Sequence, residues 1–441
     1  MARRWLISGL LTVAAFAQMH AAVAQSTSPP FPHLGAYLIS GSVQQSFGTA
    51  SFQQQVAKLN AVVIGLYPGW SSGGFSLSSL GTALKSYNPN MKITLYTNAM
   101  EFESGVGTAG SAYSPEFISV TGANWFLRSG WPSGSIELDS GSYQEINITS
   151  PHAYNGKTYR QQRAAWSAAN EFTTPWDGVY LDNFGLQPSS NGDFLENGTT
   201  QSGSAAASLW QTSYANYVSQ LNSALPAGAQ VWGNTATWGN GSLSNYNQVL
   251  NGGVIEHFIG QSFSYESQGW AVMMNTYGSI MKATIAPGYQ IFSQDDASAT
   301  DYQGMRYGLA SCLLDNGYYY FNTNSYNAVN WFDEFNASLG APASGPAGAA
   351  TATYSNGGLK VWQNGVWRRD FTNGIALVNP KGNGPQTVTL ETTYTHLSGT
   401  QAPTINNGQS VTSVTLQDRD GLILLRAAAQ AVPDPPSLTV Q

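Results

Sequence analysis

The strongest constraint on the fold is an alternation of short apolar segments with longer amphipathic ones, from about residue 33 to about residue 340. Eight of the short segments have the length and composition of strands: Gly35–Ile39, Ala61–Tyr67, Lys92–Asn98, Gly178–Phe184, Gln230–Thr235, Val254–Ile259, Ala283–Ala286 and Gly317–Phe321. Several are apolar at almost every position, which is typical of strands buried on both faces of a parallel sheet. Apolar residues between them recur at helical spacing, as at Tyr214, Val218 and Leu221.

Eight strands alternating with helices predict an α/β fold. The number of strands favours a (β/α)8 TIM barrel over a doubly wound sheet. Neither G-x-G-x-x-G nor G-x-x-x-x-G-K-[ST] follows any of the strands, which removes the main support for a nucleotide-binding fold. The third and fourth strands begin 86 residues apart, at Lys92 and Gly178. An average barrel unit has about 31 residues. We interpret the excess as an insertion at the strand end where barrels build active sites.

The two ends of the chain predict further segments. Residues 1–24 have the basic start, apolar run and small-residue cleavage site of a signal peptide, so we expect an exported bacterial protein, secreted or periplasmic, without a membrane span. The barrel is predicted over residues 25–340 and a Gly/Ala/Pro-rich linker over 341–352. A small antiparallel β-sandwich domain is predicted over 353–426, with a packing role, and a disordered tail over 427–441.

Composition excludes several classes of function. The net charge is −7 and only 9% of residues are charged, which leaves no basic surface for nucleic acid. A single cysteine, Cys312, cannot form a disulfide within the chain. The five histidines show no metal-ligand spacing, and there is no G-x-S-x-G motif. We therefore expect no metal and no cofactor, and we expect a monomer.

Two acids belong to the fourth predicted strand. Asp177 opens the strand and Asp182 closes it. Five residues at about 3.3 Å each place them roughly 16 Å apart, so they cannot act as a pair. We interpret Asp177 as structural. Asp182 follows an apolar run, where a carboxylate is costly unless it faces the mouth of the barrel, so it is the first catalytic candidate.

Glu256 is the second catalytic candidate, because it is embedded in the sixth predicted strand. A buried, hydrogen-bonded glutamate with no catalytic part is the alternative. Two carboxylates at one barrel mouth are what glycoside cleavage requires: one stabilises or attacks the oxocarbenium-like centre and the other protonates the leaving oxygen. Different surroundings would keep one of them protonated.

Substrate contacts are predicted for polar and aromatic residues at or just after strand ends, where aromatic faces can stack on sugar rings. The predicted substrate-binding residues are Tyr67, Trp70, Tyr96, Asn98, Glu101, Asn183, Asn234, Gln261, Asp295 and Asp296. Trp238 and Tyr289 also lie at or just after predicted strand ends, where their ring faces could stack on a sugar. Ordinary core packing is the alternative for each aromatic residue, and helix capping for the adjacent acids Asp295 and Asp296.

Four segments together resemble one family. They are residues 176–184 (WDGVYLDNF), 305–317 (MRYGLASCLLDNG), 367–380 (WRRDFTNGIALVNP) and 418–425 (DRDGLILL). The first is similar to the strand motif of the hypothetical glycosyl hydrolases of family fifteen, and more distantly to polygalactosaminidase-like barrels. The resemblance covers most of residues 33–426, and it implies a barrel joined to a terminal β-domain.

The resemblance implies a glycoside hydrolase whose strand-four acid is Asp182. By analogy with retaining α-glycosidase barrels that use acids on strands four and six, Asp182 would be the nucleophile and Glu256 the acid/base. The sequence therefore predicts an exported enzyme that cleaves a poly- or oligosaccharide. A non-catalytic glycan-binding barrel and a structural cell-surface protein remain as alternatives.

Overall fold

The computed structural model describes residues 30–107, 111–139, 141–172, 175–295, 298–323, 325–343 and 361–426. The predicted signal peptide and tail, most of the predicted linker and Asp296 lie outside the described residues.

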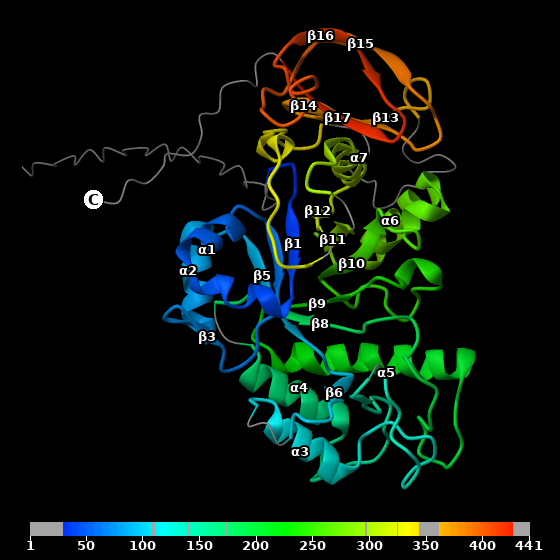
Figure 1. Ribbon diagram of the computed structural model, residues 1–441. Coiled ribbons are helices and arrows are strands. Elements are labelled where there is room, and N and C mark those ends of the chain that lie inside the picture. The colour runs from blue at the N-terminus through cyan, green and yellow to red at the C-terminus, as the bar shows by residue number, and fades with distance from the viewer. Residues whose placement is uncertain are drawn as a thin grey trace, which may run out of the picture.

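Eight parallel strands form the barrel in the middle of the molecule (Figure 1). In sheet order they are β1 (Gly35–Leu38), β2 (Ala61–Ile64), β5 (Lys92–Thr97), β8 (Gly178–Leu181), β9 (Gln230–Asn234), β10 (Gly252–Ile259), β11 (Tyr289–Gln294) and β12 (Tyr318–Phe321). This order follows the chain, and each strand pairs in parallel with the next. The ring closes where Leu34 bridges Tyr319, whose N–H donates to the His33 carbonyl at 3.0 Å. The predicted (β/α)8 fold is confirmed.

Helices pack around the barrel between the strands. They are α1 (Ala50–Val56), α2 (Leu77–Tyr87), α4 (Tyr159–Asn170), α5 (Gly203–Ala224), α6 (Trp270–Ala283) and α7 (Tyr302–Leu313), with 3-10 turns η1 (Gly41–Val43), η2 (Ser46–Gly48), η4 (Tyr265–Gln268) and η5 (Asp333–Asn336). In α5 the predicted face, with Tyr214, Val218 and Leu221, is buried. Between β9 and β10, where every residue is described, the turn η3 (Trp238–Asn240) takes the place of an α-helix.

The seventh strand is not where the sequence analysis placed it. Ala283 is the last residue of α6, and β11 begins at Tyr289. The strand was missed because three polar residues lie buried in it, Gln290, Ser293 and Gln294. Their hydrogen bonds make this burial tolerable: Gln290 donates to Thr284 at 2.9 Å, for example.

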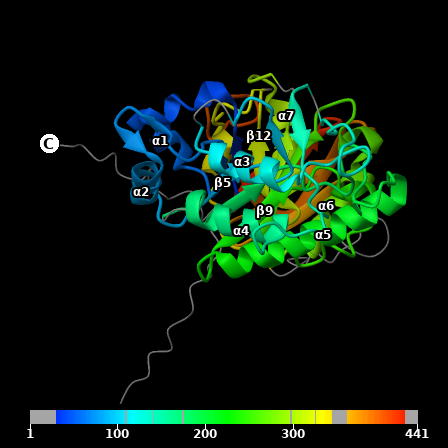
Figure 2. The same ribbon diagram turned by 90° about the horizontal axis from the view of Figure 1, so that it is seen from below.

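The insertion after β5 forms a layer of its own. It contains α3 (Ser114–Ala123) and the strand pair β6 (Glu101–Glu103) and β7 (Tyr143–Glu145) before α4 begins. A second short pair, β3 (Ser71–Ser72) and β4 (Phe75–Ser76), follows β2. In Figure 1 the insertion lies below the barrel, and in Figure 2, seen from below, α3 lies in front of the strands. The insertion therefore covers the end of the barrel at which β5 and its neighbours finish.

Residues 361–426 add a five-stranded antiparallel sheet at the opposite end of the molecule (Figure 1). Its order is β13 (Trp367–Phe371), β14 (Gly374–Asn379), β17 (Asp420–Arg426), β15 (Gln386–His396) and β16 (Ser410–Leu416). Successive residues of β14 alternate between two cores: Ala376 and Val378 join the barrel core, while Ile375 and Leu377 join a second cluster with β15 and β16. The predicted antiparallel β-structure after the barrel is confirmed.

A buried ion pair joins this sheet to α7. Arg306 donates through Nε and Nη2 to Asp420 Oδ1, at 3.2 and 3.0 Å, and both side chains are more than nine-tenths buried. A buried charge that loses its partner is strongly destabilising, whereas a pair of apolar replacements can be neutral.

Arg306→Met is therefore expected to lower the free energy of unfolding by about 3 kcal/mol, because it leaves the Asp420 carboxylate buried and unpaired. Urea unfolding followed by tryptophan fluorescence measures the change. The double variant Arg306→Met/Asp420→Leu is the matched control, and it should recover most of the loss. A loss below about 1 kcal/mol in the single variant would contradict the assigned role of this pair.

Candidate active site

Polar side chains from four neighbouring strands meet at the rim that the insertion covers. Asp182 directly follows β8, Asn234 is the last residue of β9, Glu256 lies in β10, and Asp295 directly follows β11. These strands are consecutive in the barrel. Because the carboxyl ends of parallel strands share one rim, residues far apart in the chain become neighbours there.

Asn234 links the two predicted catalytic acids. Its Nδ2 donates to Asp182 Oδ1 at 3.0 Å and to Glu256 Oε1 at 2.8 Å. Since both bonds meet at one nitrogen, the sum of their lengths limits the separation of these two oxygens to 5.8 Å. A spacing of about 5–5.5 Å between carboxyl groups is typical of retaining glycosidases, whereas inverting enzymes need about 6.5–9.5 Å.

Asp182 is held by groups from three directions. The Tyr96 hydroxyl donates to its Oδ2 at 2.5 Å, and the Asn183 N–H donates to its Oδ1 at 2.9 Å. The Tyr214 hydroxyl of α5 donates to its backbone carbonyl at 2.7 Å. Asn183 adopts a left-handed conformation, with φ of 55°, so it turns the chain and fixes the carboxylate. Charged hydrogen-bond acceptors held in this way stay in one orientation.

Glu256 lies at an irregularity in β10. The pairing with β11 shifts register between Ile255 and Ile259, which re-aims the side chains of this stretch. Burial raises the pKa of Glu256 to about 7, and the negative charge of Asp182 adds to the effect. Glu256 is thus a carboxyl group that is largely protonated below neutral pH, as a general acid must be.

Asp295 does not face a substrate, in contrast to the prediction. It is fully buried. Ser293 Oγ and Asn322 Nδ2 donate to its Oδ1 at 2.6 and 2.8 Å. The His257 N–H and the Tyr326 hydroxyl donate to its Oδ2 at 2.6 and 3.0 Å. Both oxygens are already occupied, so no lone pair points to a sugar hydroxyl.

A pocket of about 490 Å³ opens beside Tyr96 and collects four of the predicted substrate-binding residues. Its lining includes Tyr67, Tyr96, Asn98 and Glu101, together with Tyr143 of β7. Tyr67 is 46% exposed and offers a ring face to solvent. The volume lies in the range of small-ligand sites. The insertion thus forms one wall of the pocket.

Glu101 is an acid within this pocket. Burial raises its pKa to about 8, and the neighbouring Asp139 contributes through a hydrogen bond and its charge. Asn98 Nδ2 donates to Glu101 Oε1 at 2.7 Å. The two acids, Glu101 and Asp139, can thus hold one proton between them at the wall of the pocket.

The remaining predicted residues lie elsewhere. Trp70 and Trp238 are 4% and 1% exposed and pack in the core, so neither offers a ring face to a sugar. Tyr289 opens β11 at the opposite end of the barrel, where it stacks on Trp232. Gln261 follows β10, and its backbone carbonyl accepts from Ser264 Oγ at 2.6 Å. The structural role predicted for Asp177 is confirmed by its ion pairs with Lys85 and Lys92.

Sequence reasoning missed the residues behind the two acids. Tyr37, Tyr180 and Tyr326 lie near Asp182 and Glu256, and burial raises the pKa of all three hydroxyl groups. Tyr37 contacts both other rings, at centroid distances of 5.3 Å. Tyr37 and Tyr180 occur within apolar strand segments, where a tyrosine looks like ordinary core.

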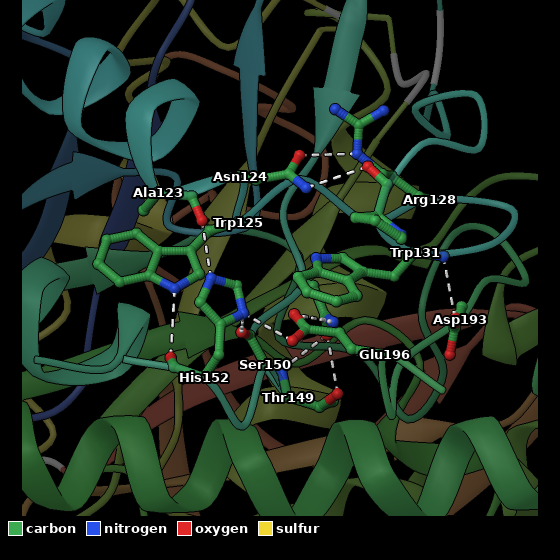
Figure 3. Close-up of polar contacts among 12 residues, drawn as sticks. Ala123, Asn124, Trp125, Arg128, Trp131, Thr149, Ser150, His152, Asp193 and Glu196 are labelled. Atoms are coloured by element: carbon green, nitrogen blue, oxygen red, sulfur yellow. Dashed lines mark hydrogen bonds and ion pairs between the residues drawn. The ribbon is translucent and has the colours of Figure 1, made fainter. Parts of the chain in front are cut away.

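A hydrogen bond between His152 and Glu196 joins the insertion to the loop that follows β8 (Figure 3). Glu196 Oε2 and Ser150 Oγ both approach His152 Nδ1, at 2.6 and 3.0 Å, while Nε2 faces the Ala123 carbonyl at 2.7 Å. A Ser-His-acid triad places the serine and the acid on opposite ring nitrogens. This cluster therefore does not form a triad, and it connects the two loops that flank the rim.

Within the part of the chain that the structure describes, no group of three or more His, Cys, Asp or Glu side chains is arranged to hold a metal ion. Among the same residues, none of the helices combines the length and apolar character that a membrane crossing requires.

The barrel carries two acids at one rim, an arrangement that glycoside hydrolases use. Residues 85–375, about two thirds of the chain, match the hypothetical glycosyl hydrolase family 15. The chain belongs to this family and is a glycoside hydrolase that acts on glycans.

Several solved structures are similar to this chain. Amy13B from Eubacterium rectale is 9% identical with a TM-score of 0.48, over 89% of this chain and 94% of that chain. A pullulanase from Bacillus acidopullulyticus is 13% identical with a TM-score of 0.46, over 89% and 60%. The cycloalternan-degrading enzyme from Trueperella pyogenes is 11% identical with a TM-score of 0.47, over 90% and 62%. No curated protein matches the chain.

Proposed function

We propose that this chain is an exported, monomeric hydrolase of a poly- or oligosaccharide that acts through two carboxylates and retains the anomeric configuration. Asp182 is the nucleophile and Glu256 is the acid/base. The observation that carries the proposal is the amide of Asn234, which donates to both acids and limits the distance between Asp182 Oδ1 and Glu256 Oε1 to 5.8 Å. This limit supports the close pair of carboxyl groups of a retaining enzyme, in which one carboxylate attacks directly.

The first half of the reaction forms a covalent intermediate. Glu256 donates its proton to the glycosidic oxygen, and Asp182 attacks the anomeric carbon as the bond to that oxygen breaks. The raised pKa of Glu256, caused by burial and by the charge of Asp182, supports the acid role. Tyr96 and Asn183 keep the Asp182 carboxylate in place for attack.

The second half releases the sugar. Glu256, now a carboxylate, takes a proton from water, which attacks the same carbon and displaces Asp182. Both acids return to their starting states, so the reaction needs no further reagent. The pocket lined by Tyr67, Tyr96 and Glu101 is the site for the sugar on the nucleophile side, because Tyr96 also donates to Asp182.

The test is incubation of the purified protein with a panel of glycans, followed by measurement of new reducing ends. Release that is lost in the Asp182→Asn/Glu256→Gln double variant is the expected result. Binding of a glycan without any new reducing ends would contradict the proposal and favour a glycan-binding barrel. Neither binding nor cleavage would favour a structural protein.

A further inference from the structure

Asp295 is a third carboxylate next to the two catalytic acids, and the mechanism above does not use it. It is fully buried, so it cannot touch the substrate. Four donors from Ser293, Asn322, His257 and Tyr326 surround it. A buried charge is retained only where such contacts stabilise it. Burial acts to raise the pKa of Asp295, but these hydrogen bonds outweigh burial and lower it. Asp295 is therefore a fixed negative charge.

One path leads from Asp295 to the backbone beside Glu256. His257 has a φ of 53°, a left-handed conformation that is unfavourable for a residue other than glycine. The His257 N–H donates to Asp295 Oδ2 at 2.6 Å, and the His257 Nδ1 lies 3.0 Å from the same oxygen. Gly260 has a φ of 102°, and a Cβ there would lie 2.3 Å from the Asp295 carbonyl oxygen. The turn that aims Glu256 is thus built against Asp295.

A second path runs through a side chain. The Tyr326 hydroxyl donates to Asp295 Oδ2 at 3.0 Å, and it also lies close enough to Glu256 to lower the pKa of that carboxyl group. Burial, followed by the charge of Asp295, raises the pKa of Tyr326 far above neutral pH, so its hydroxyl keeps its one proton. The Tyr326 backbone is anchored: its N–H donates to Asn322 Oδ1 at 3.0 Å and its carbonyl accepts from Ile39 at 3.1 Å. The one hydroxyl proton of Tyr326 is therefore held by Asp295, beside Glu256.

We propose that Asp295 is a positioning residue for the acid/base: it fixes the backbone turn after Glu256 and draws the Tyr326 proton to itself, so that Glu256 keeps its orientation and its own proton. The inference rests on the proposed function, because it assigns Glu256 as the acid. Asp295 acts through His257 and Tyr326 and not by contact with the sugar.

The charged and titratable groups that face Glu256 set the expected signs. Asp182 and Asp295 raise the pKa of Glu256, whereas His257 and the Tyr326 hydroxyl lower it. Tyr326→Phe is therefore expected to raise the titration midpoint of Glu256. In Asp295→Asn the Tyr326 hydroxyl no longer has the Asp295 charge to donate to, and it donates to Glu256. Tyr326→Phe should therefore raise the titration midpoint of Glu256 by more in this variant than in the wild type.

The experiment compares Asp295→Asn, Tyr326→Phe and the double variant in the full chain. The Glu256 midpoint is followed by 13C NMR of labelled glutamate side chains, assigned with Glu256→Gln. We expect Tyr326→Phe to raise the titration midpoint of Glu256 by about half a pH unit in the wild-type background. In the Asp295→Asn background the rise should be about twice as large. We expect kcat to fall about 30-fold in Asp295→Asn with KM changed less than about threefold, and the double variant to lose no more than Asp295→Asn alone.

Two results would overturn the inference. One is a rise of the Glu256 midpoint on Tyr326→Phe that is equal in the wild-type and Asp295→Asn backgrounds. The other is a double variant whose fold-loss in kcat is the product of the two single fold-losses, because that would show that the two residues act independently. Thermal melting of each variant separates these outcomes from unfolding. Because the NMR titration needs no substrate, the predicted midpoints without any glycan cleavage would reject the proposed function and leave the Asp295 network standing.

Discussion

Replacement of Asp182 by asparagine is expected to lower kcat at least about a thousandfold while the protein stays folded. The amide cannot attack the anomeric carbon, so no covalent intermediate forms. The side chain keeps its size, and its one remaining oxygen can still accept from Asn234 Nδ2. The new amide NH2 then faces Tyr96, whose hydroxyl oxygen can accept from it. The measurement is turnover of the glycan that the reducing-end panel identifies, together with circular dichroism to confirm the fold.

A control from the same strand separates this effect from general damage. Asp177→Asn changes a carboxylate at the other end of β8, where it binds Lys85 and Lys92. Its kcat should stay within about threefold of wild type at a temperature well below the unfolding midpoint. In the smaller variant Asp182→Ala, added azide should restore turnover and give a glycosyl azide of inverted configuration. A variant at Asp182 with near-wild-type activity would remove this residue from the mechanism.

Glu256→Gln is expected to lower kcat by about a hundredfold to ten-thousandfold for natural glycans, because their leaving group requires a proton. Aryl glycosides with good leaving groups should lose much less in the first step. The wild-type kcat/KM should fall as pH rises through about 7, because Glu256 loses its proton there. The variant should lack this fall, since glutamine does not titrate.

The control for the second prediction is another buried glutamic acid. Burial raises the pKa of Glu334 as well, but its side chain accepts a hydrogen bond from Asn406, in the loop between β15 and β16. Glu334→Gln should keep the alkaline fall in kcat/KM and the full turnover at neutral pH. If Glu256→Gln also kept that fall, another group would be the acid.

Much of the barrel could be predicted because most of its strands are apolar at nearly every position. β1, β2, β8 and β12 are buried along their whole length, and the sequence placed all four. β11 was missed because its buried Gln290, Ser293 and Gln294 look like a loop in the sequence. Their burial is possible only with partners such as Thr284 and Tyr319, which come from other elements.

Some residues of the site could be predicted from the sequence and others could not. Asp182, Asn234 and Glu256 were found because each is a polar residue within or just after an apolar strand, and the structure brings these three together. Asp295 was predicted only as one of two adjacent acids beyond a seventh strand that was placed too early, and in the structure it is fully buried. Tyr326 could not be found, because it reaches Asp295 from a loop with a left-handed backbone that no sequence pattern marks.

The most direct test of the central claim is to trap and locate the covalent intermediate. The enzyme is treated with a 2-deoxy-2-fluoro glycoside of the sugar that the panel identifies, digested, and mapped by mass spectrometry. The account predicts one added sugar, on the peptide that contains Asp182, and none on the Asp182→Asn variant. A sugar attached to Glu256 or to any other side chain, or a first product of inverted configuration, would contradict it.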